Sequence, residues 1–195
     1  MLFARVLRSP HPHARIRSID GSRALALDGV RAVLTYENCR IVWSSGDRVN
    51  QRRIFNNPVR LVGDPVAAVA ATDRHLAEEA LKLIEVDYEP LDFVLTAEEA
   101  LEPGAVEIHP GGNLSPVISF TSQGPGKREP STYVRGDVEQ GFADSDRVFE
   151  DHFISKHINN AQMEPRVAVA QWEGDKLTVW TPTQGISNCH RDIAR

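Results

Sequence analysis

A strand, a helix and a second strand follow one another over residues 63–90, and this unit constrains the fold more than any other part of the sequence. Gly63-Asp64-Pro65 is typical of a turn, and the apolar run at 66–71 predicts a buried strand. Residues 72–84 start with helix-capping side chains and continue with apolar residues at helical spacing. Apolar and acidic residues then alternate over 84–90, which predicts a second strand. The chain is therefore expected to be an α/β (α+β) protein.

A weaker copy of this pattern lies nearer the N-terminus. Residues 16–20 alternate, residues 22–27 could form a short helix, and residues 30–35 are strand-like. We expect both copies to form α/β layers on one sheet, with a right-handed crossover if their strands are parallel.

Proline and glycine mark a change of organisation after residue 101. Thr96 and Glu99 form a capping-box pattern, which predicts a short helix just before this point. Frequent prolines and glycines then interrupt the helical or strand spacing of apolar residues, which indicates a linker. The sequence therefore predicts a first domain at 1–101, a linker at 102–135 and a β-led region at 136–195.

The β-led region is expected to contain a hairpin. Residues 147–155 and 167–172 are strand-like, and the turn at 173–175 leads into a further strand at 176–180. In this hairpin Trp172 and Trp180 are expected to face each other and pack.

A last helix is expected after the hairpin. Thr183 is predicted to cap a helix that starts at Gly185. No C-cap glycine or stop signal appears before Arg195, so we expect this helix to be cut. Its apolar stripe would be Ile186, Cys189 and Ile193.

The composition argues against several classes of partner. The net charge is -5 without a basic block, so neither nucleic acid nor an anionic membrane is an expected partner. No apolar run approaches the roughly 20 residues of a membrane span, and the first residues do not resemble a secretory leader. Cys39 and Cys189 form no CxxC pair, which favours a reducing compartment and a cytoplasmic protein.

Few side chains suggest a metal or catalytic site. The histidines are scattered, and the best trio, His152, His157 and Glu164, lacks the spacing of a zinc site, so we predict no metal ligands. Glu164 is expected to cap backbone amides or to pair with Arg166, and no catalytic residue is predicted. The glycine-rich stretch 124–127 lacks phosphate-loop spacing and is interpreted as a loop.

Three strings of residues, in this order, resemble one known family. They are Leu7–Ile16, Val62–Ala70, and the stretch from Met163-Glu164-Pro165 through Trp172 to Gln184. As a set they are similar to the molybdopterin-binding large subunit of the xanthine dehydrogenase and aldehyde oxidase family, the molybdenum hydroxylases. The resemblance covers essentially the whole chain. It implies an α/β hammerhead domain followed by the first β-rich part of a molybdopterin-binding domain.

The resemblance also implies a chemistry. In such enzymes a molybdenum cofactor hydroxylates an aldehyde or an N-heterocyclic or aromatic substrate with oxygen from water, and electrons leave through iron-sulfur clusters to FAD on partner chains. Gln184 matches the family's glutamine beside a metal oxo ligand, and it is the one candidate cofactor-binding residue. A neutral amide can donate a hydrogen bond there without adding charge. The alternative is an exposed helix-start residue.

Two functional hypotheses follow from the resemblance. Family members are longer at both ends, and the region after Arg195 holds their catalytic glutamate, so the chain is expected to be inactive alone. Its expected partners are iron-sulfur and FAD subunits and, in a split enzyme, a second chain that supplies the missing region. The alternative is a non-catalytic binding or assembly module that docks on a partner. A fragment should leave the hairpin at 167–180 exposed, whereas a stand-alone module should cover it.

Overall fold

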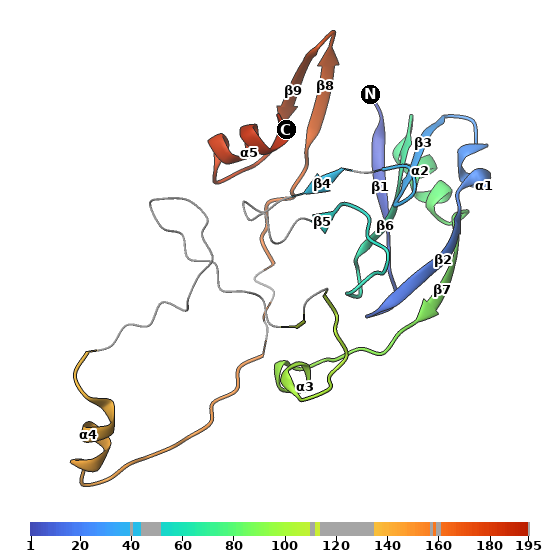
Figure 1. Cartoon of the computed structure of the whole chain (residues 1–195). Helices are drawn as coiled ribbons and strands as arrows, with labels where there is room; N and C mark the ends of the chain where they lie inside the picture. The colour runs from blue at the N-terminus through green and yellow to red at the C-terminus, as the bar shows by residue number, and fades with distance from the viewer. Residues whose placement is uncertain are drawn as a thin grey trace. The chain divides into compact units, whose positions relative to one another are not determined.

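The chain forms two units, each with its own secondary structure (Figure 1). The computed structural model describes residues 1–39, 41–43, 52–109, 112–113, 135–156, 158 and 161–194. The first unit is Met1–Arg128 and the second is Glu129–Arg195. Among the described residues, every buried side chain belongs to the first unit.

The first unit contains both predicted strand-helix-strand patterns. Its elements are β1 (Phe3–Arg8), β2 (Ala14–Asp20), α1 (Ser22–Leu25), β3 (Val30–Thr35), β4 (Val42–Trp43), β5 (Arg52–Arg53), β6 (Pro65–Ala71), α2 (Arg74–Leu81), β7 (Glu85–Pro90) and α3 (Ala97–Leu101). The expected patterns are therefore confirmed as β2-α1-β3 and β6-α2-β7. Strand β1 was missed because its sequence, FARVLR, places apolar and basic residues on both faces.

The expectation of one shared sheet is wrong. Strands β1, β6 and β3 form an antiparallel sheet in that order, whereas β2 pairs with β7 in a separate antiparallel pair. Strands β4 and β5 form another small pair. Helix α2 has eight residues and rises about 12 Å, whereas the seven residues of β6 span about 23 Å. After this short helix the chain does not pair with β6 again, and β7 pairs with β2 instead.

The main core lies between the helices and one face of the three-stranded sheet. Ala67, Val69 and Ala71 of β6 are fully buried and belong to the same cluster as Ala77 and Ala80 of α2, which are also fully buried. Small side chains on both elements let the helix approach the sheet closely. The first unit thus has its own core.

A second, smaller core lies beside the first. It consists of Ala14 and Ile16 of β2, Val59, and Val66 at the start of β6. Partly buried Leu7, Ile19 and Val86 pack against both clusters, so the two cores are continuous.

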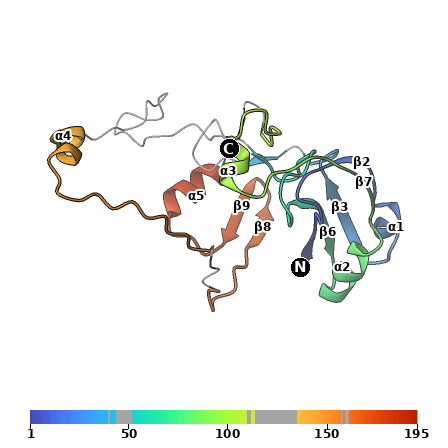
Figure 2. The ribbon, with the colours of Figure 1, turned by 90° about the horizontal axis from the view of Figure 1, so that it is seen from below.

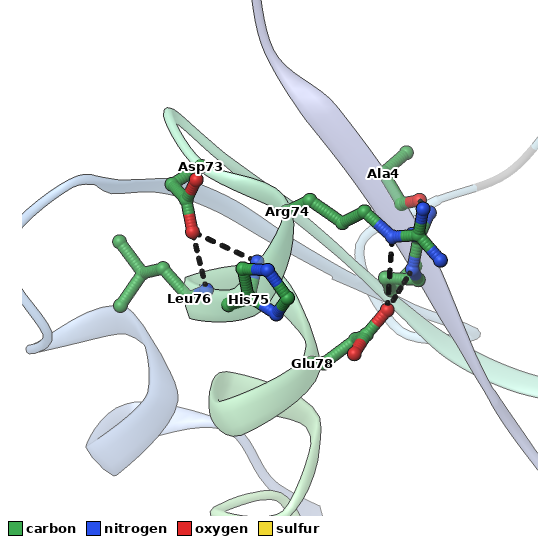
Figure 3. Close-up of polar contacts among 7 residues, drawn as sticks. Ala4, Asp73, Arg74, His75, Leu76 and Glu78 are labelled. Carbon is green, nitrogen blue, oxygen red and sulfur yellow. Dashed lines mark hydrogen bonds and ion pairs between the residues drawn. The ribbon is translucent and has the colours of Figure 1, made fainter.

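Polar contacts cap α2 and connect it to the sheet (Figure 3). The Asp73 carboxylate accepts hydrogen bonds from the backbone N–H groups of His75 and Leu76, at 2.8 and 3.1 Å, so the predicted N-cap is confirmed. Glu78 on α2 lies 3.0 Å from the guanidinium of Arg5 on β1 and 3.4 Å from that of Arg74. The helix is thereby connected to an edge strand of the sheet.

The predicted capping box at α3 is also confirmed. The Thr96 hydroxyl accepts from the Glu99 N–H at 3.2 Å, and the Glu99 carboxylate accepts from the Thr96 N–H at 3.3 Å. Beyond α3 the chain contacts the earlier part of the unit, because the Arg60 guanidinium donates to the Ile108 carbonyl at 2.7 Å.

The second unit is sparse. Its described elements are α4 (Val138–Ala143), β8 (Val169–Glu173), β9 (Lys176–Trp180) and α5 (Ile186–Ile193). The predicted hairpin is confirmed as β8–β9. The predicted strand at 147–155 is wrong, because the described residues offer it no partner strand for hydrogen bonding. Helix α4 was missed, since Gly141 interrupts its pattern.

The two faces of the sheet should differ in their response to side-chain truncation. Val69→Ala should destabilise the first unit by about 2 kcal/mol, because it removes fully buried methyl groups and leaves a cavity. Val6→Ala, the matched control on the other face, should cost less than about 1 kcal/mol, since that side chain is partly exposed. Both losses of unfolding free energy can be measured by hydrogen exchange, in increasing urea, of the peptide that covers β6. Equal losses would contradict the assigned core.

The N-cap of α2 makes the stability of the first unit depend on pH. Hydrogen bonds from the backbone N–H groups of Leu76 and then His75 hold the pKa of Asp73 below its ordinary value of 3.8. This contribution is therefore present above the unfolded pKa and is lost as pH falls through the folded pKa. The advantage of the wild type over Asp73→Asn in melting temperature should be constant well above pH 3.8 and should decline as the pH is lowered below this value. An advantage that does not change with pH would contradict this assignment.

Candidate functional site

The hairpin that leads to the candidate site has a fixed register. Gly174 adopts a left-handed backbone (φ 59°), as a tight two-residue turn requires. The register pairs Trp172 with Leu177 and Trp180 with Val169. The prediction that the two tryptophans face each other is therefore wrong. Trp172 lies three residues from Val169, the partner of Trp180, so the two indoles lie on opposite faces of the hairpin.

A short turn joins the hairpin to α5 (Figure 2). Strand β9 ends at Trp180, and Pro182 lacks the N–H that would continue a ladder. The Thr183 hydroxyl accepts from the Gly185 N–H at 3.1 Å. Gly185 itself is the N-cap of α5, with no side-chain cap. The prediction that Thr183 caps the helix is therefore wrong, because its hydroxyl binds an amide one residue before the first helical turn.

Gln184 lies at the centre of this turn and is exposed. Within the described part of the chain its carboxamide makes no hydrogen bond. The first backbone amides of α5 follow directly, and the glycine N-cap leaves them without a side-chain acceptor. The turn therefore presents a neutral amide beside the electropositive end of a helix. Such a donor set suits an anionic or oxygen-rich group.

The remaining acidic and histidine candidates do not converge. Glu164 is exposed, and among the described residues it forms neither a backbone cap nor an ion pair with Arg166, so its expected structural role stays a prediction. His157 and the stretch 124–127 lie outside the described residues. The described residues contain no group of three metal-ligating side chains.

Apolar side chains of the second unit are widely exposed. Phe149 is 81% exposed and Phe153 is 87% exposed, and they lie on a segment without regular structure. Trp172 and Trp180 on the hairpin are 67% and 53% exposed. No described residue of this unit is buried, so its apolar residues form no core of their own.

Two further observations concern the environment of the chain. None of the helices in the described part is long and apolar enough to cross a membrane. Cys39 and Cys189 are both free thiols, the first buried and the second partly exposed.

Comparison with known families accounts for both units. Residues 1–92 match the family described as "Aldehyde oxidase and xanthine dehydrogenase, a/b hammerhead domain". Residues 121–195 match the "Molybdopterin cofactor-binding domain". Together the two matches place the chain in the class of molybdopterin-binding large subunits. The chain belongs to the xanthine dehydrogenase and aldehyde oxidase family, as the resemblance of its three strings implied.

Individual relatives agree with this assignment. The chain is 36% identical to a probable xanthine dehydrogenase subunit of Bacillus subtilis over 94% of its own length and 23% of the relative. It is 35% identical to the nicotinate dehydrogenase large molybdopterin subunit of Eubacterium barkeri, over 98% and 42% respectively. The crystal structure of quinoline 2-oxidoreductase from Pseudomonas putida 86 superposes with a TM-score of 0.74 at 35% identity, over 94% of this chain and 23% of that one.

The chain spans about a quarter of the length of most of the relatives it matches. The larger share of the Eubacterium barkeri subunit, 42%, shows that this relative is much shorter than the others. Molybdopterin subunits that contain this stretch therefore differ in length.

The turn around Gln184 fits a molybdenum cofactor. Molybdopterin carries a phosphate and presents oxygen atoms at the metal, and these groups accept hydrogen bonds. The exposed carboxamide of Gln184 and the uncapped amides of α5 are donors without a competing negative side chain in the helix's first turn. We find no other donor set of this kind within the described part of the second unit.

The Thr183 hydroxyl should determine the order of this turn. In Thr183→Ala the Gly185 N–H loses its acceptor, so its exchange with solvent should become about fivefold faster, as expected for a hydrogen bond worth about 1 kcal/mol. Thr183→Ser keeps the hydroxyl and is the matched control. Amide hydrogen exchange measured by NMR tests both. The same Gly185 rate in the wild type and in Thr183→Ala would mean that the hydroxyl does not order the turn.

Proposed function

We propose that this chain is the N-terminal part of the large subunit of a molybdenum hydroxylase. In this proposal residues 1–101 form the hammerhead domain, and residues 136–195 begin the molybdopterin-binding domain. The observation that carries the proposal is the turn at 181–185, in the part that matches the molybdopterin-binding family. This turn presents uncapped helix amides and a carboxamide that has no hydrogen-bond partner among the described residues. The enzyme would hydroxylate its substrate with an oxygen atom derived from water.

The chain's own residues have a positioning role in this proposal. When bound, the cofactor supplies the metal at which the substrate is oxidised. Gln184 would donate its amide N–H to an oxygen of the cofactor, and its lack of charge leaves the electronic balance of the metal unchanged. The Thr183 hydroxyl, through its contact with Gly185, holds the turn in shape.

In this proposal a further polypeptide must cover the exposed side chains of the second unit. Its phenylalanines and tryptophans are largely exposed, and the hairpin β8–β9 has no third strand among the described residues. Exposed apolar surface of this extent is unfavourable in water. The missing polypeptide, supplied either by the same gene product or by a second chain, would cover this surface and bring the catalytic base. The chain alone would be inactive.

Partners and location follow from the same proposal. Iron-sulfur and FAD subunits would carry electrons away from the cofactor, in keeping with relatives whose names describe them as subunits. The two free thiols support a reducing compartment, and we place the protein in the cytoplasm.

The substrate class is an aldehyde or a nitrogen heterocycle. The named relatives point to the second, because xanthine, nicotinate and quinoline are all aromatic nitrogen heterocycles. In this proposal the walls that select among such rings would be supplied by the missing polypeptide.

Substitution of Gln184 tests the proposed role. In the complex purified from the native host, Gln184→Ala should lower the turnover of a nitrogen heterocycle about 10- to 100-fold, with the molybdenum content unchanged. Gln171→Ala on β8 is the matched control, since Gln171 donates only to Glu173 on the same strand and should leave turnover unchanged. Dye-linked oxidation of xanthine, nicotinate and quinoline provides the assay.

Equal turnover of Gln184→Ala and Gln171→Ala would refute the role of Gln184. A complex that lacks molybdenum but still contains partner subunits would instead favour the alternative, a non-catalytic binding or assembly module.

A further inference from the structure

The first turn of α5 carries a second carboxamide, that of Asn188. This side chain is exposed and belongs to the third residue of the helix. Its oxygen Oδ1 accepts a hydrogen bond from the guanidinium of Arg191 at 2.7 Å. A guanidinium can only donate, so the oxygen of the carboxamide must face Arg191 and the NH2 group must face away from it. The contact with Arg191 therefore fixes the orientation of the Asn188 side chain.

Arg191 is itself held beside a carboxylate. Its Nε lies 4.0 Å from the carboxylate of Asp192, and a guanidinium has enough donors to contact Asp192 and Asn188 together. Both members of this ion pair are partly exposed, so the pair contributes little to stability. Its main consequence is to restrict the guanidinium that orients Asn188.

The NH2 group of Asn188 lies beside Gly185, the N-cap of α5. A Cβ added to Gly185 would lie 3.7 Å from Nδ2 and 3.8 Å from Cβ of Asn188, which are ordinary contact distances. The φ of Gly185 is −131°, outside the left-handed region that favours glycine. Neither the packing nor the backbone thus calls for a glycine here. Gly185 leaves open a space that a side chain could fill.

This open space is bordered by hydrogen-bond donors. Within the described part of the chain the NH2 group of Asn188 has no acceptor. The first amides of α5 have no side-chain acceptor at the N-cap, and the first turn of the helix contains no acidic residue. An oxygen atom of a ligand could therefore accept from both kinds of donor.

We propose that Asn188 is a second amide donor to the molybdenum cofactor, with Arg191 as its positioning residue and Gly185 leaving room for the bound oxygen. This inference rests on the proposed function, because it adds residues to the site of Gln184. The group that is bound is an oxygen atom of the cofactor, either at its phosphate or at its metal. Both kinds of oxygen accept hydrogen bonds from an amide.

A purely structural role for Asn188 makes the opposite prediction for one substitution. Side chains three residues apart on a helix can stabilise it by their contact alone. Aspartate at this position would serve that role at least as well, because its charge suits the start of a helix and binds a guanidinium more strongly. It would, however, remove the NH2 donor. Asn188→Asp therefore separates the two roles.

The test follows the loss of molybdenum during dialysis of the complex purified from the native host. Asn188→Asp in the full chain should lose molybdenum at least tenfold faster than the wild type, because a carboxylate repels the oxygen that the amide binds. Its melting temperature after complete dialysis should be at or above that of the wild type. Gln140→Glu, the same chemical change at the third residue of α4, is the matched control and should leave the rate unchanged.

The positioning role of Arg191 is tested by a double substitution. Arg191→Ala alone should speed the loss of molybdenum about threefold, because the carboxamide of Asn188 is then free to rotate. In an Asn188→Ala background the same substitution should have no further effect, since no carboxamide remains to be oriented. Additive effects would mean that Arg191 acts through its charge, and would overturn its positioning role.

Electron paramagnetic resonance of the reduced molybdenum, recorded before dialysis, distinguishes the two positions of the oxygen. A spectrum changed by Asn188→Asp would place the oxygen at the metal. An unchanged spectrum with faster loss of molybdenum would place it at the phosphate.

The outcomes separate this inference from the proposed function. A wild-type complex with molybdenum and an Asn188→Asp complex that retains it equally well would overturn the inference alone. Loss of partner subunits together with molybdenum in Asn188→Asp would also overturn it, because Asn188 would then act in assembly. Unchanged turnover in Gln184→Ala would refute the role of Gln184 and not that of Asn188. A wild-type complex without molybdenum would refute both proposals.

Discussion

The packing of β6 into two hydrophobic clusters is the interaction on which the first unit depends. Ala67, Val69 and Ala71 share one cluster with alanines of α2, and Val66 packs in the other with Ala14 and Ile16 of β2 and with Val59. Because Ala67, Ala77 and Ala80 have no exposed surface, a larger residue at any of them would force the helix away from the sheet. The turn at Gly63 and the N-cap at Asp73 determine where this strand and its helix begin.

The second unit shows what happens where such packing is absent. Its hairpin and its last helix have regular backbone hydrogen bonds, but the described side chains around them remain exposed. A binding group must be held within a fraction of an ångström by rigid surroundings to act on a cofactor. In the proposed function, Gln184 therefore depends on the covering polypeptide for its precision, and assembly precedes activity.

Local signals in the sequence were sufficient to predict most helices, strands and turns. They were not sufficient to predict which strands pair with each other. The N-cap at Asp73, the capping box at Thr96 and the turn at Gly174 each depend on a few neighbouring residues, and all were predicted. The pairing of β2 with β7 joins strands that lie far apart in the sequence, which a local pattern of apolar residues does not specify. Strand β1 and helix α4 were missed because their apolar residues do not follow a regular period. Gln184 was found only through family resemblance, since a lone exposed glutamine carries no chemical signal of its own.

The most direct test of the account is the molybdenum content of the chain purified from its native host, measured by elemental mass spectrometry together with the intact mass of everything that accompanies it. The account predicts about one molybdenum per chain, together with the polypeptide that carries the rest of the molybdopterin-binding region. A chain free of molybdenum, recovered without any such polypeptide, would contradict it.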